Sequence, residues 1–454
     1  MLTFGMIKEV DFYFFNSLMS QNKLKEFEID KSVESFVKKY GSLLKGYDTF
    51  TYKLRERLYD VCGDLVLENK LKLTNVIPLS SGGSLDYALF DDYIKNSRSN
   101  LESALKSNKN IVFVMGHKNP DTDAVISSMF EAWRNHLENP LTVYVPIVQS
   151  KRLPDEVTEL IPSLSDYVLL TNDPLYELAK QSSLIRWISV DQNEESEVQK
   201  SFVSIIDHHL PSKIAKNQNI PKTLELLGSC AALVTRKYLG MGFSLDEKLA
   251  KILYGASLMD TENKTISKMT KKDVLIMDYL KKTSRIKDDN EFYSKLMGRL
   301  LNTDDADNLF NRDYKDNFGF GFAVAKVKNC FSNNGEVKKQ SLVNRLYSLA
   351  NNNNKEKDFP LTLVKITDYC NDNMTVNRER IVVLFNVDVG DEFKKTIKMT
   401  LEGTIHFEFQ EDELNSELSY VDLCGTGLQL SRKKMVPILQ PFIGLSMGND
   451  FHYV

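Results

Sequence analysis

The chain has 454 residues, 42% hydrophobic and 26% charged, a composition typical of globular proteins and unlike that of disordered or collagen-like chains. Its 58 basic and 62 acidic residues leave a formal charge of −4, so it lacks the basic field expected of a nucleic-acid-binding protein. At roughly 150 residues per domain, the length predicts about three domains.

The five cysteines are scattered and contain no C-x-x-C pair, which argues against a disulfide framework or a thiolate zinc site and favours a reducing compartment. The N-terminal segment carries Lys8, Glu9 and Asp11 where a targeting sequence would be apolar. No later stretch approaches the ~18 uninterrupted apolar residues of a membrane span. We therefore expect a cytoplasmic protein without membrane or nucleic-acid partners.

Residues 1–105 show the apolar spacing of helices among Lys and Glu residues, which predicts an N-terminal helical extension. Within it, the Ser-Ser-Gly-Gly-Ser turn at 80–84 offers backbone N–H groups to an anion, although such a segment is far more often only a turn. The sequence assigns no role to this extension.

From residue 106 to residue 282, short apolar runs alternate with amphipathic segments, which predicts βαβ units and a parallel sheet. Helices are expected over 245–280, and the charged segment 281–290 predicts an exposed linker and a domain boundary. Residues 291–454 predict a smaller α+β domain. In that domain we expect a solvated loop at 351–357 and strands over 318–327, 361–366, 380–388 and 396–401.

Acidic and imidazole side chains follow the first apolar run of the expected sheet. His117, Asp121 and Asp123 lie in the loop between that strand and the next helix. Ligands of open α/β sheets bind beyond the carboxyl ends of the strands, so this loop lies where a site is expected. The alternative is that both aspartates only cap the helix, but capping does not explain His117.

Similar residues end three further apolar runs. Asp191 follows one run, the triplet 207–209 (Asp-His-His) follows another, and Asp260 follows a third. Any one of them alone would more often be a buried and satisfied polar residue. Their recurrence at successive strand or helix ends favours one shared site instead.

The ligand types indicate divalent metal ions. Oxygen and imidazole ligands without thiolate suit Mn²⁺, Co²⁺ or Mg²⁺, and two such ions would be balanced by the carboxylates of Asp121, Asp123, Asp191 and Asp260. Two ions roughly 3.5 to 4 Å apart can activate a bridging water and hold a phosphoryl oxygen. The pattern therefore predicts hydrolysis of a phosphoric ester or anhydride. The substrate would also need cationic donors, and the basic run at 432–434 is a candidate, although such a run is usually solvated surface.

In their order along the chain, the segments 116–123, 190–194, 207–209 and 260–261 resemble the motifs of the DHH phosphoesterase superfamily. The similar branch has a DHHA2 domain and holds the family II inorganic pyrophosphatases and related exopolyphosphatases. The resemblance implies an α/β fold with a parallel-sheet DHH domain over 106–282 and a DHHA2 substrate-binding domain over 291–454. It also implies manganese-dependent hydrolysis of pyrophosphate, with two metal ions activating water as the two domains close.

Carried over position by position, the resemblance implies that His117 and Asp121 hold one ion, while Asp123, His208 and Asp260 hold the other. Asp191 would bridge both ions. His209 would be the general acid for the leaving phosphate, and Asp207 would orient the imidazoles. The phosphate-binding cations would be Arg432 and Lys433, with either Lys295 or Arg299 as a further contact.

Departures from the motifs keep other activities open. Gln192 stands where the pyrophosphatases commonly have His, and residues 260–263 are similar to the exopolyphosphatases, but these often replace the residue at His117 by Asn. Pyrophosphate is therefore favoured, with polyphosphate as the alternative. A nucleotide phosphodiesterase is disfavoured because the C-terminal section has no Gly-Gly-Gly-His motif, and a binding module because every ligand position is filled. The oligomeric state stays open, with a homodimer considered.

Overall fold

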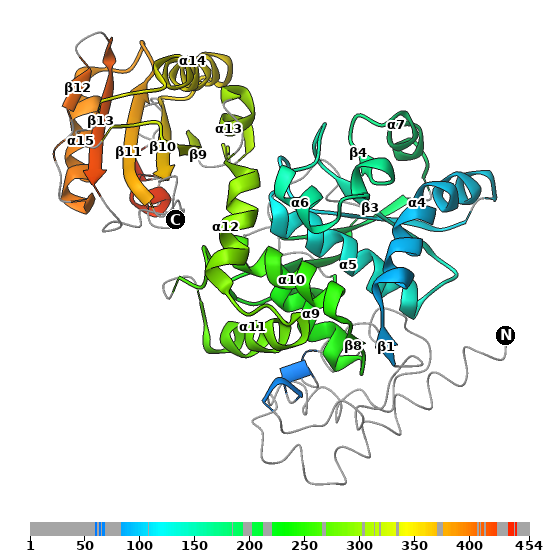
Figure 1. Cartoon of the computed structure of the whole chain (residues 1–454). Coiled ribbons are helices and arrows are strands. Elements are labelled where there is room, and N and C mark those ends of the chain that lie inside the picture. Colours follow the sequence, from blue (N-terminus) through cyan, green and yellow to red (C-terminus); the bar gives the residue numbers. More distant parts are fainter. Residues whose placement is uncertain are drawn as a thin grey trace, which may run out of the picture. The chain divides into compact units, whose positions relative to one another are not determined.

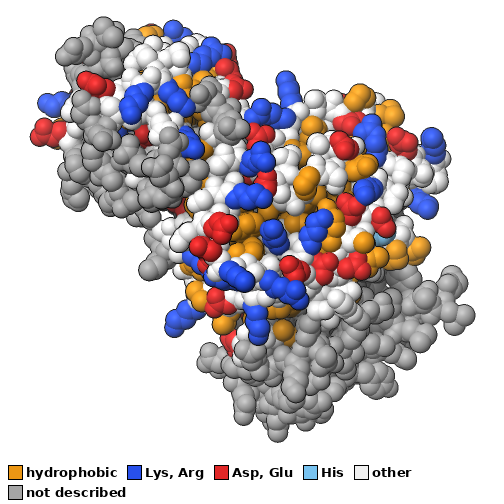
Figure 2. Space-filling model, in the orientation of Figure 1, with side chains coloured by type: hydrophobic (Ala, Val, Ile, Leu, Met, Phe, Trp, Pro, Cys, Tyr) orange, Lys and Arg blue, Asp and Glu red, His pale blue; other side chains and the backbone are white. Residues whose placement is uncertain are grey.

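The computed structural model describes residues 60, 63–64, 66–68, 83–107, 109–183, 185–193, 202–211, 220–265, 269–301, 305–312, 314–316, 319–332, 336–369, 376–405, 408, 410–412, 415–424, 435–439 and 441–442. The chain divides near residue 292 into two compact units (Figure 1). Most of residues 1–82, including the start of the turn at 80–84, lies outside the described residues. On the face that Figure 2 draws, positive and negative side chains of the described residues are interspersed, as the balanced composition predicts.

Among the described residues, six strands form the sheet of the first unit, in the order β4-β3-β2-β5-β6-β7. They are β2 (Ile111–Met115), β3 (Val143–Val148), β4 (Leu169–Leu170), β5 (Ile185–Val190), β6 (Phe202–Asp207) and β7 (Lys222–Leu224). All neighbouring strands are parallel, which confirms the expected sheet. Strand β2 is central and buried along its whole length, which explains its continuously apolar sequence.

The strand order creates a crevice beside β2. From β2 the chain adds β3 and β4 on one side, and then returns to place β5, β6 and β7 on the other. The connections therefore leave the carboxyl ends of β2 and β5 in opposite directions, and ligands of open α/β sheets bind at such a point. The segments that follow these two strands begin at Gly116 and Asp191.

The helices of the first unit pack on this sheet or on one another. They are α4 (Tyr87–Ser107), α5 (Thr122–Glu138), α6 (Asp155–Leu160), α7 (Pro174–Lys180), α9 (Cys230–Gly240), α10 (Glu247–Asp260) and α11 (Lys271–Ser284). Helix α5 is buried from Thr122 to Asn135 because it packs against β2 and β3 as well as α9 and α10. Leu101 of α4 shares a core with Phe113 of β2, so α4 packs as part of the sheet unit. None of the described helices has the length and apolar character needed to cross a bilayer.

Short elements complete this unit. The strands β1 (Ser84–Leu85) and β8 (Ser244–Leu245) pair in parallel, and η2 (Leu164–Asp166) is a turn of 3-10 helix. The expected linker at 281–290 is partly helical, because α11 continues to Ser284 and α12 (Asp289–Leu300) begins at Asp289. The short segment between these helices begins at Arg285, whose φ is 56°.

In the described part of the second unit, five strands form a mixed sheet in the order β12-β13-β11-β10-β9. They are β9 (Gly321–Lys328), β10 (Leu361–Tyr369), β11 (Val376–Phe385), β12 (Gln410–Asp412) and β13 (Asn415–Cys424), with helices α13 (Ala306–Arg312), α14 (Gln340–Lys357) and α15 (Asp391–Ile405). Alternate residues of β10 point to separate cores, Leu363 to one that contains α15 and Val364 to one that contains α14. The expected α+β class is confirmed.

Two local expectations for this unit are wrong. Residues 396–401 are helical rather than a strand, because Phe393, Ile397 and Leu401 recur every four residues on the face of α15 that meets the sheet. Residues 351–357 are the last turns of α14 rather than a solvated loop. The polar side chain of Asn354 is buried there, where it donates to the carbonyl of Leu384 and accepts from the hydroxyl of Thr362.

Candidate metal centre

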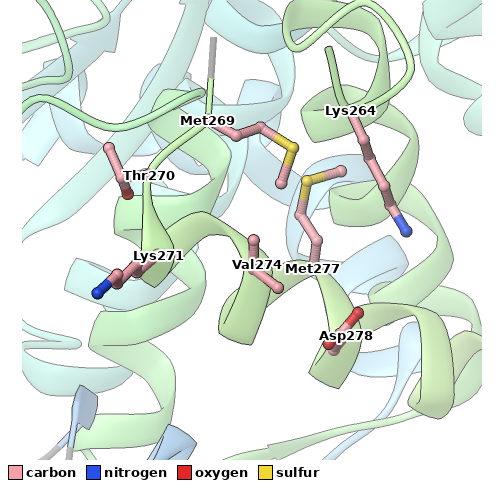
Figure 3. Close-up of a pocket in the computed structure, with 7 residues that line it drawn as sticks. All are labelled: Lys264, Met269, Thr270, Lys271, Val274, Met277 and Asp278. Atoms are coloured by element: carbon pink, nitrogen blue, oxygen red, sulfur yellow. The ribbon is translucent and has the colours of Figure 1, made fainter. Parts of the chain in front are cut away.

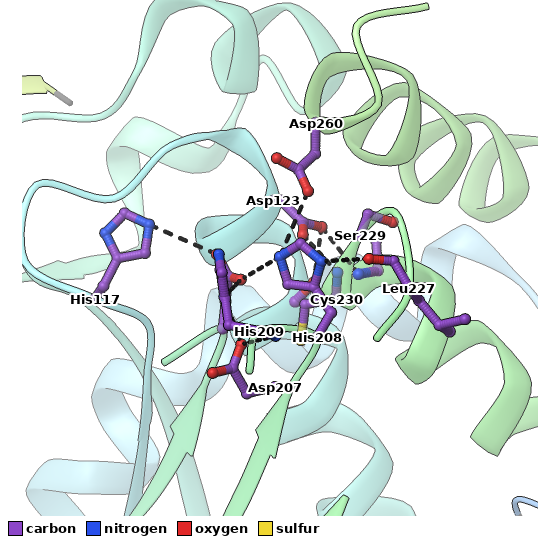
Figure 4. Close-up of polar contacts among 12 residues, drawn as sticks. His117, Asp123, Asp207, His208, His209, Leu227, Ser229, Cys230 and Asp260 are labelled. Atoms are coloured by element: carbon purple, nitrogen blue, oxygen red, sulfur yellow. Dashed lines mark hydrogen bonds and ion pairs between the residues drawn. The ribbon is translucent and has the colours of Figure 1, made fainter. Parts of the chain in front are cut away.

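Acidic and histidine side chains meet at the sheet edge beside β2 and β5 (Figure 4). Within each of three groups of described residues, one potential ligand atom of every member lies within 4.8 Å of the others. The groups are Asp191 with Asp207, His208 and His209; His117 with Asp121 and Asp191; and Asp123 with His208 and Asp260. We call these eight residues the Asp/His cluster. It brings together all the metal-site and general-acid residues expected from the sequence.

Asp191 lies at the centre of the Asp/His cluster. It follows β5 directly with a φ of 56°, a left-handed conformation that Asp adopts more readily than most residues. Its Oδ1 atom lies 3.1 Å from Nε2 of His208, and its Oδ2 atom lies 3.6 Å from Nε2 of His117. The Oδ1 atom is buried and accepts no hydrogen bond from the described residues. A buried carboxylate oxygen in this state fits a bound cation.

His208 presents one ring nitrogen to the carboxylates. Its Nδ1 lies 2.9 Å from the carbonyl of Leu227, which can only accept, so Nδ1 carries a proton and Nε2 faces Asp191 and Asp260. Burial alone lowers the pKa of His208, but the charges of Asp260, Asp191 and Asp123 raise it by more, and the net pKa lies well above the ordinary value. This position therefore attracts a cation.

Asp123 is held by a helix other than its own. Its carboxylate accepts hydrogen bonds from the backbone N–H groups of Cys230 at 2.6 Å and Ala231 at 2.9 Å, at the start of α9 (Figure 4). The next N–H group of α9, that of Ala232, donates to the side chain of Ser229. The helix terminus favours negative charge and fixes the position of the carboxylate. Capping of its own helix α5 does not account for these contacts.

Asp207 and His209 form a pair. One carboxylate oxygen of Asp207 accepts from Nδ1 of His209 at 2.8 Å and from its backbone N–H group at 3.2 Å, while the other accepts from the amide of Asn193. Burial raises the pKa of Asp207, but the hydrogen bond and charge of His209 contribute most to a net pKa below the ordinary value. The side chain of His209 is 39% exposed, so Nε2 is accessible while Nδ1 is engaged.

The side-chain amides of Gln192 and Gln149 hold the loop that follows β2. Gln192 donates to the carbonyl of Gly116 at 3.0 Å, and Gln149 donates to the same oxygen. A Cβ atom at Gly116 would lie 2.8 Å from Cβ of Ala124, so the loop approaches α5 closely. Gln192, which stands where the pyrophosphatase motif commonly has His, therefore holds the backbone of Gly116, the residue before His117. Sequence reasoning missed Gln149, although it follows the end of β3.

The proposed phosphate contacts are not brought together by the described residues. Arg432 and Lys433 lie outside them. Lys295 and Arg299 lie four residues apart in α12, on one face of that helix, so their positions favour neither over the other. These assignments remain predictions.

A separate cavity of about 380 Å³ lies in the first unit (Figure 3). It is lined by Lys264, Met269, Thr270, Lys271, Val274, Met277 and Asp278. Met269, Val274 and Met277 contribute apolar side chains to this lining, which includes no residue of the Asp/His cluster. The cavity is therefore distinct from the candidate metal centre.

Comparison with known proteins agrees with this geometry. Residues 111–257 match the family model described as DHH family, N-terminal domain. A probable manganese-dependent inorganic pyrophosphatase of Clostridium acetobutylicum is 26% identical over 302 residues, covering 62% of this chain and 91% of that protein. One of Streptococcus mutans is 27% identical over 155 residues, and mouse exopolyphosphatase PRUNE1 is 27% identical over 199 residues.

The chain spans 48% of the length of the S. mutans protein and 42% of that of the mouse protein, aligned over 33% and 40% of its own residues. A crystal structure of a putative family II inorganic pyrophosphatase from Methanococcus jannaschii matches with a TM-score of 0.54 and 20% identity, covering 73% of this chain and 99% of that one. This likeness establishes the fold.

Proposed function

Because the chain contains a domain of the DHH family, we propose that it hydrolyses inorganic pyrophosphate to two phosphates with the help of two divalent metal ions. The observation that carries the proposal is the central position of Asp191. This residue groups with His117 and Asp121, and its Oδ1 atom also lies 3.1 Å from His208, a member of the group with Asp123 and Asp260.

The donor set fits two such ions. The residues that would hold them offer carboxylate oxygens and imidazole nitrogens, which suits Mn²⁺ first and also Co²⁺ or Mg²⁺. The buried Oδ1 atom of Asp191, which accepts no hydrogen bond from the described residues, and the carboxylates of Asp191 and Asp260 beside His208 support the same assignment. When bound, the ions would supply a water of lowered pKa and polarise a phosphoryl oxygen.

The remaining chemistry belongs to side chains of this chain. Asp207 accepts a hydrogen bond from the Nδ1–H group of His209, which fixes the ring of this partly exposed side chain and leaves Nε2 free of that contact. We expect His209 to hold a proton at Nε2 and donate it to the leaving phosphate. Arg432 and Lys433, with Lys295 or Arg299, would supply the cationic donors for the phosphate oxygens. The cytoplasmic location and a homodimer remain predictions from the sequence.

Exopolyphosphatase activity is the second candidate. It is supported by the similarity to mouse exopolyphosphatase PRUNE1, at an identity equal to that of the S. mutans pyrophosphatase. Gln192 in place of the usual His is a further reason to test longer substrates.

The test measures phosphate release from pyrophosphate and from polyphosphates of several lengths, each with Mn²⁺, Co²⁺ or Mg²⁺. Asp191→Ala should abolish turnover, whereas Glu177→Gln, which neutralises an exposed carboxylate on α7, should behave as the parent. Faster release from pyrophosphate supports the proposal, and faster release from longer chains supports the second candidate. Silence on every substrate, or parental turnover by Asp191→Ala, would overturn the metal-dependent mechanism.

A further inference from the structure

A short piece of the N-terminal extension joins a network of charges on the first unit. We call the described part of residues 60–68 the N-terminal brace. Asp60 lies 3.0 Å from Arg236 of α9 and 3.4 Å from Lys237. Asp64 lies 3.5 Å from Arg236 and 3.0 Å from Lys272 of α11.

Glu225 completes this network. Its two carboxylate oxygens each lie 2.6 Å from a cation, one from Arg236 and the other from Lys272. The side chains of Arg236 and Lys237 are 1% and 0% exposed, and a buried cation without its counter-charge is strongly unfavourable. Two of the three carboxylates in the network come from the brace. The brace therefore contributes counter-charges that the sheet domain needs.

The brace also fits closely against the α9 backbone. A Cβ atom added at Gly63 would lie 2.3 Å from the carbonyl oxygen of Arg236 and 2.6 Å from its Cγ. A larger residue at this position would have to move the segment away from α9, because the nearest atom belongs to the backbone. Leu67, on the same segment, is buried.

The network leads directly to His208. The backbone N–H of Glu225 donates to the carbonyl of Asp207, and two residues later the carbonyl of Leu227 contacts Nδ1 of His208 at 2.9 Å. The N–H of Gly228 donates to Asp273 at 2.8 Å, one residue after Lys272. The segment that orients His208 is thus anchored on both sides by α11 and the charged network.

The network also leads to Asp123. The first two N–H groups of α9 hold the Asp123 carboxylate (Figure 4). Arg236 and Lys237 follow within two turns of the same helix. Asp123 and His208 belong to one group of potential ligands, completed by Asp260. Asp123 is therefore held by a helix that the brace contacts, and His208 by a segment whose Glu225 shares Arg236 and Lys272 with the brace.

We propose that the N-terminal brace positions Asp123 and His208, two ligands of the group that Asp260 completes, so that Asp60, Gly63 and Asp64 act on metal binding through α9 and the segment 225–228. This inference rests on the proposed metal centre and is independent of the substrate. It assigns a role to part of an extension for which the sequence alone offered none. The alternative is that the brace adds stability without influencing the ligands.

The experiment uses the full chain and two variants that disturb the brace differently. Asp60→Asn with Asp64→Asn removes its charge, and Gly63→Ala removes its close fit. Calorimetric titration of the metal-free proteins with Mn²⁺ gives the dissociation constant of each ion, and thermal unfolding gives stability. Glu177→Gln is the matched control. It also removes a carboxylate from an ion pair, but that pair, with Lys180, lies on α7, which carries no residue of the charge network or of the Asp/His cluster.

We expect each brace variant to bind one ion as the parent does and the other at least tenfold more weakly. The variant Asp64→Glu keeps the negative charge and should bind both ions with nearly the affinity of the parent. Two ions bound with parental affinity, even with a lowered unfolding temperature, would overturn the inference and leave the metal centre intact. If the double variant does not fold, Gly63→Ala and Asp64→Asn decide by the same criterion. A parent that binds no ion would overturn the metal centre itself.

Discussion

Replacement of Asp123 by Ala should destabilise the metal-free protein more than replacement of Asp260. Asp123 is buried and accepts the N–H groups of Cys230 and Ala231 at the start of α9. The side chain of Ser229 accepts from the N–H group that follows these two, that of Ala232, and therefore does not replace Asp123 as their acceptor. Asp123→Ala therefore leaves two donors without this acceptor in a buried site.

The magnitude follows from those two donors. A buried polar group that loses its partner costs roughly 1 to 3 kcal/mol, so the two N–H groups predict a loss of about 2 to 6 kcal/mol in the free energy of unfolding. Asp123→Asn should lose less, because its amide oxygen can still accept. The side chain of Asp260 is 24% exposed and can be hydrated, so Asp260→Ala should cost less than Asp123→Ala.

Urea unfolding of the proteins in excess chelator measures these differences without any contribution from bound metal. Equal losses for Asp123→Ala and Asp260→Ala would refute the idea that Asp123 stabilises the start of α9. Both variants should nonetheless lose one Mn²⁺ ion in titration. The pair therefore separates a carboxylate that supports the fold from one whose main expected role is metal binding.

Two further predictions concern pH and metal removal. Burial raises the pKa of Asp289, but hydrogen bonds from Lys264, Tyr254 and Lys281 give a net pKa below the ordinary value. Ionised Asp289 therefore stabilises the fold above the unfolded pKa of about 4, and this contribution is lost as the pH falls through the lower folded value. The stability advantage of the parent over Asp289→Asn should be constant at neutral pH and disappear in acid, and a difference independent of pH would contradict this. Chelation should lower the unfolding temperature, because an ion at 100 times its dissociation constant stabilises the native state by about 2.7 kcal/mol. An unfolding temperature unaffected by chelator would argue against metal binding to the native state.

The sheet of the first unit could be predicted from the sequence because burial on both faces imposes a local signal. Strand β2 reads as five consecutive apolar residues, and the polar residues His117 and Asp121 follow it at once. Parallel strands deliver such residues to one edge of the sheet. The same reasoning predicts Asp191 and His208 at the candidate site.

The expectation of a strand at 396–401 was wrong because the apolar residues there fit both the two-residue period of a strand and the four-residue spacing of a helix. Ile397, Met399 and Leu401 alternate as in a strand, but Met399 is 61% exposed while the other two are buried. Phe393 extends the four-residue spacing, which a six-residue window does not include. Asparagine-rich residues 351–354 suggested a loop because Asn354 finds its partners, Thr362 and Leu384, only in the folded sheet.

The contacts that hold the metal ligands were less accessible to sequence reasoning than the ligands themselves. Asp60 and Arg236 are far apart in the chain, and neither has a local pattern that identifies the other. Asp123 could be recognised from its position after a strand, but its dependence on the start of α9 required the fold. A motif specifies which atoms can bind a metal, whereas their affinity depends on the distant groups that keep them in place. The brace variants and Asp123→Ala test this distinction from opposite ends of α9.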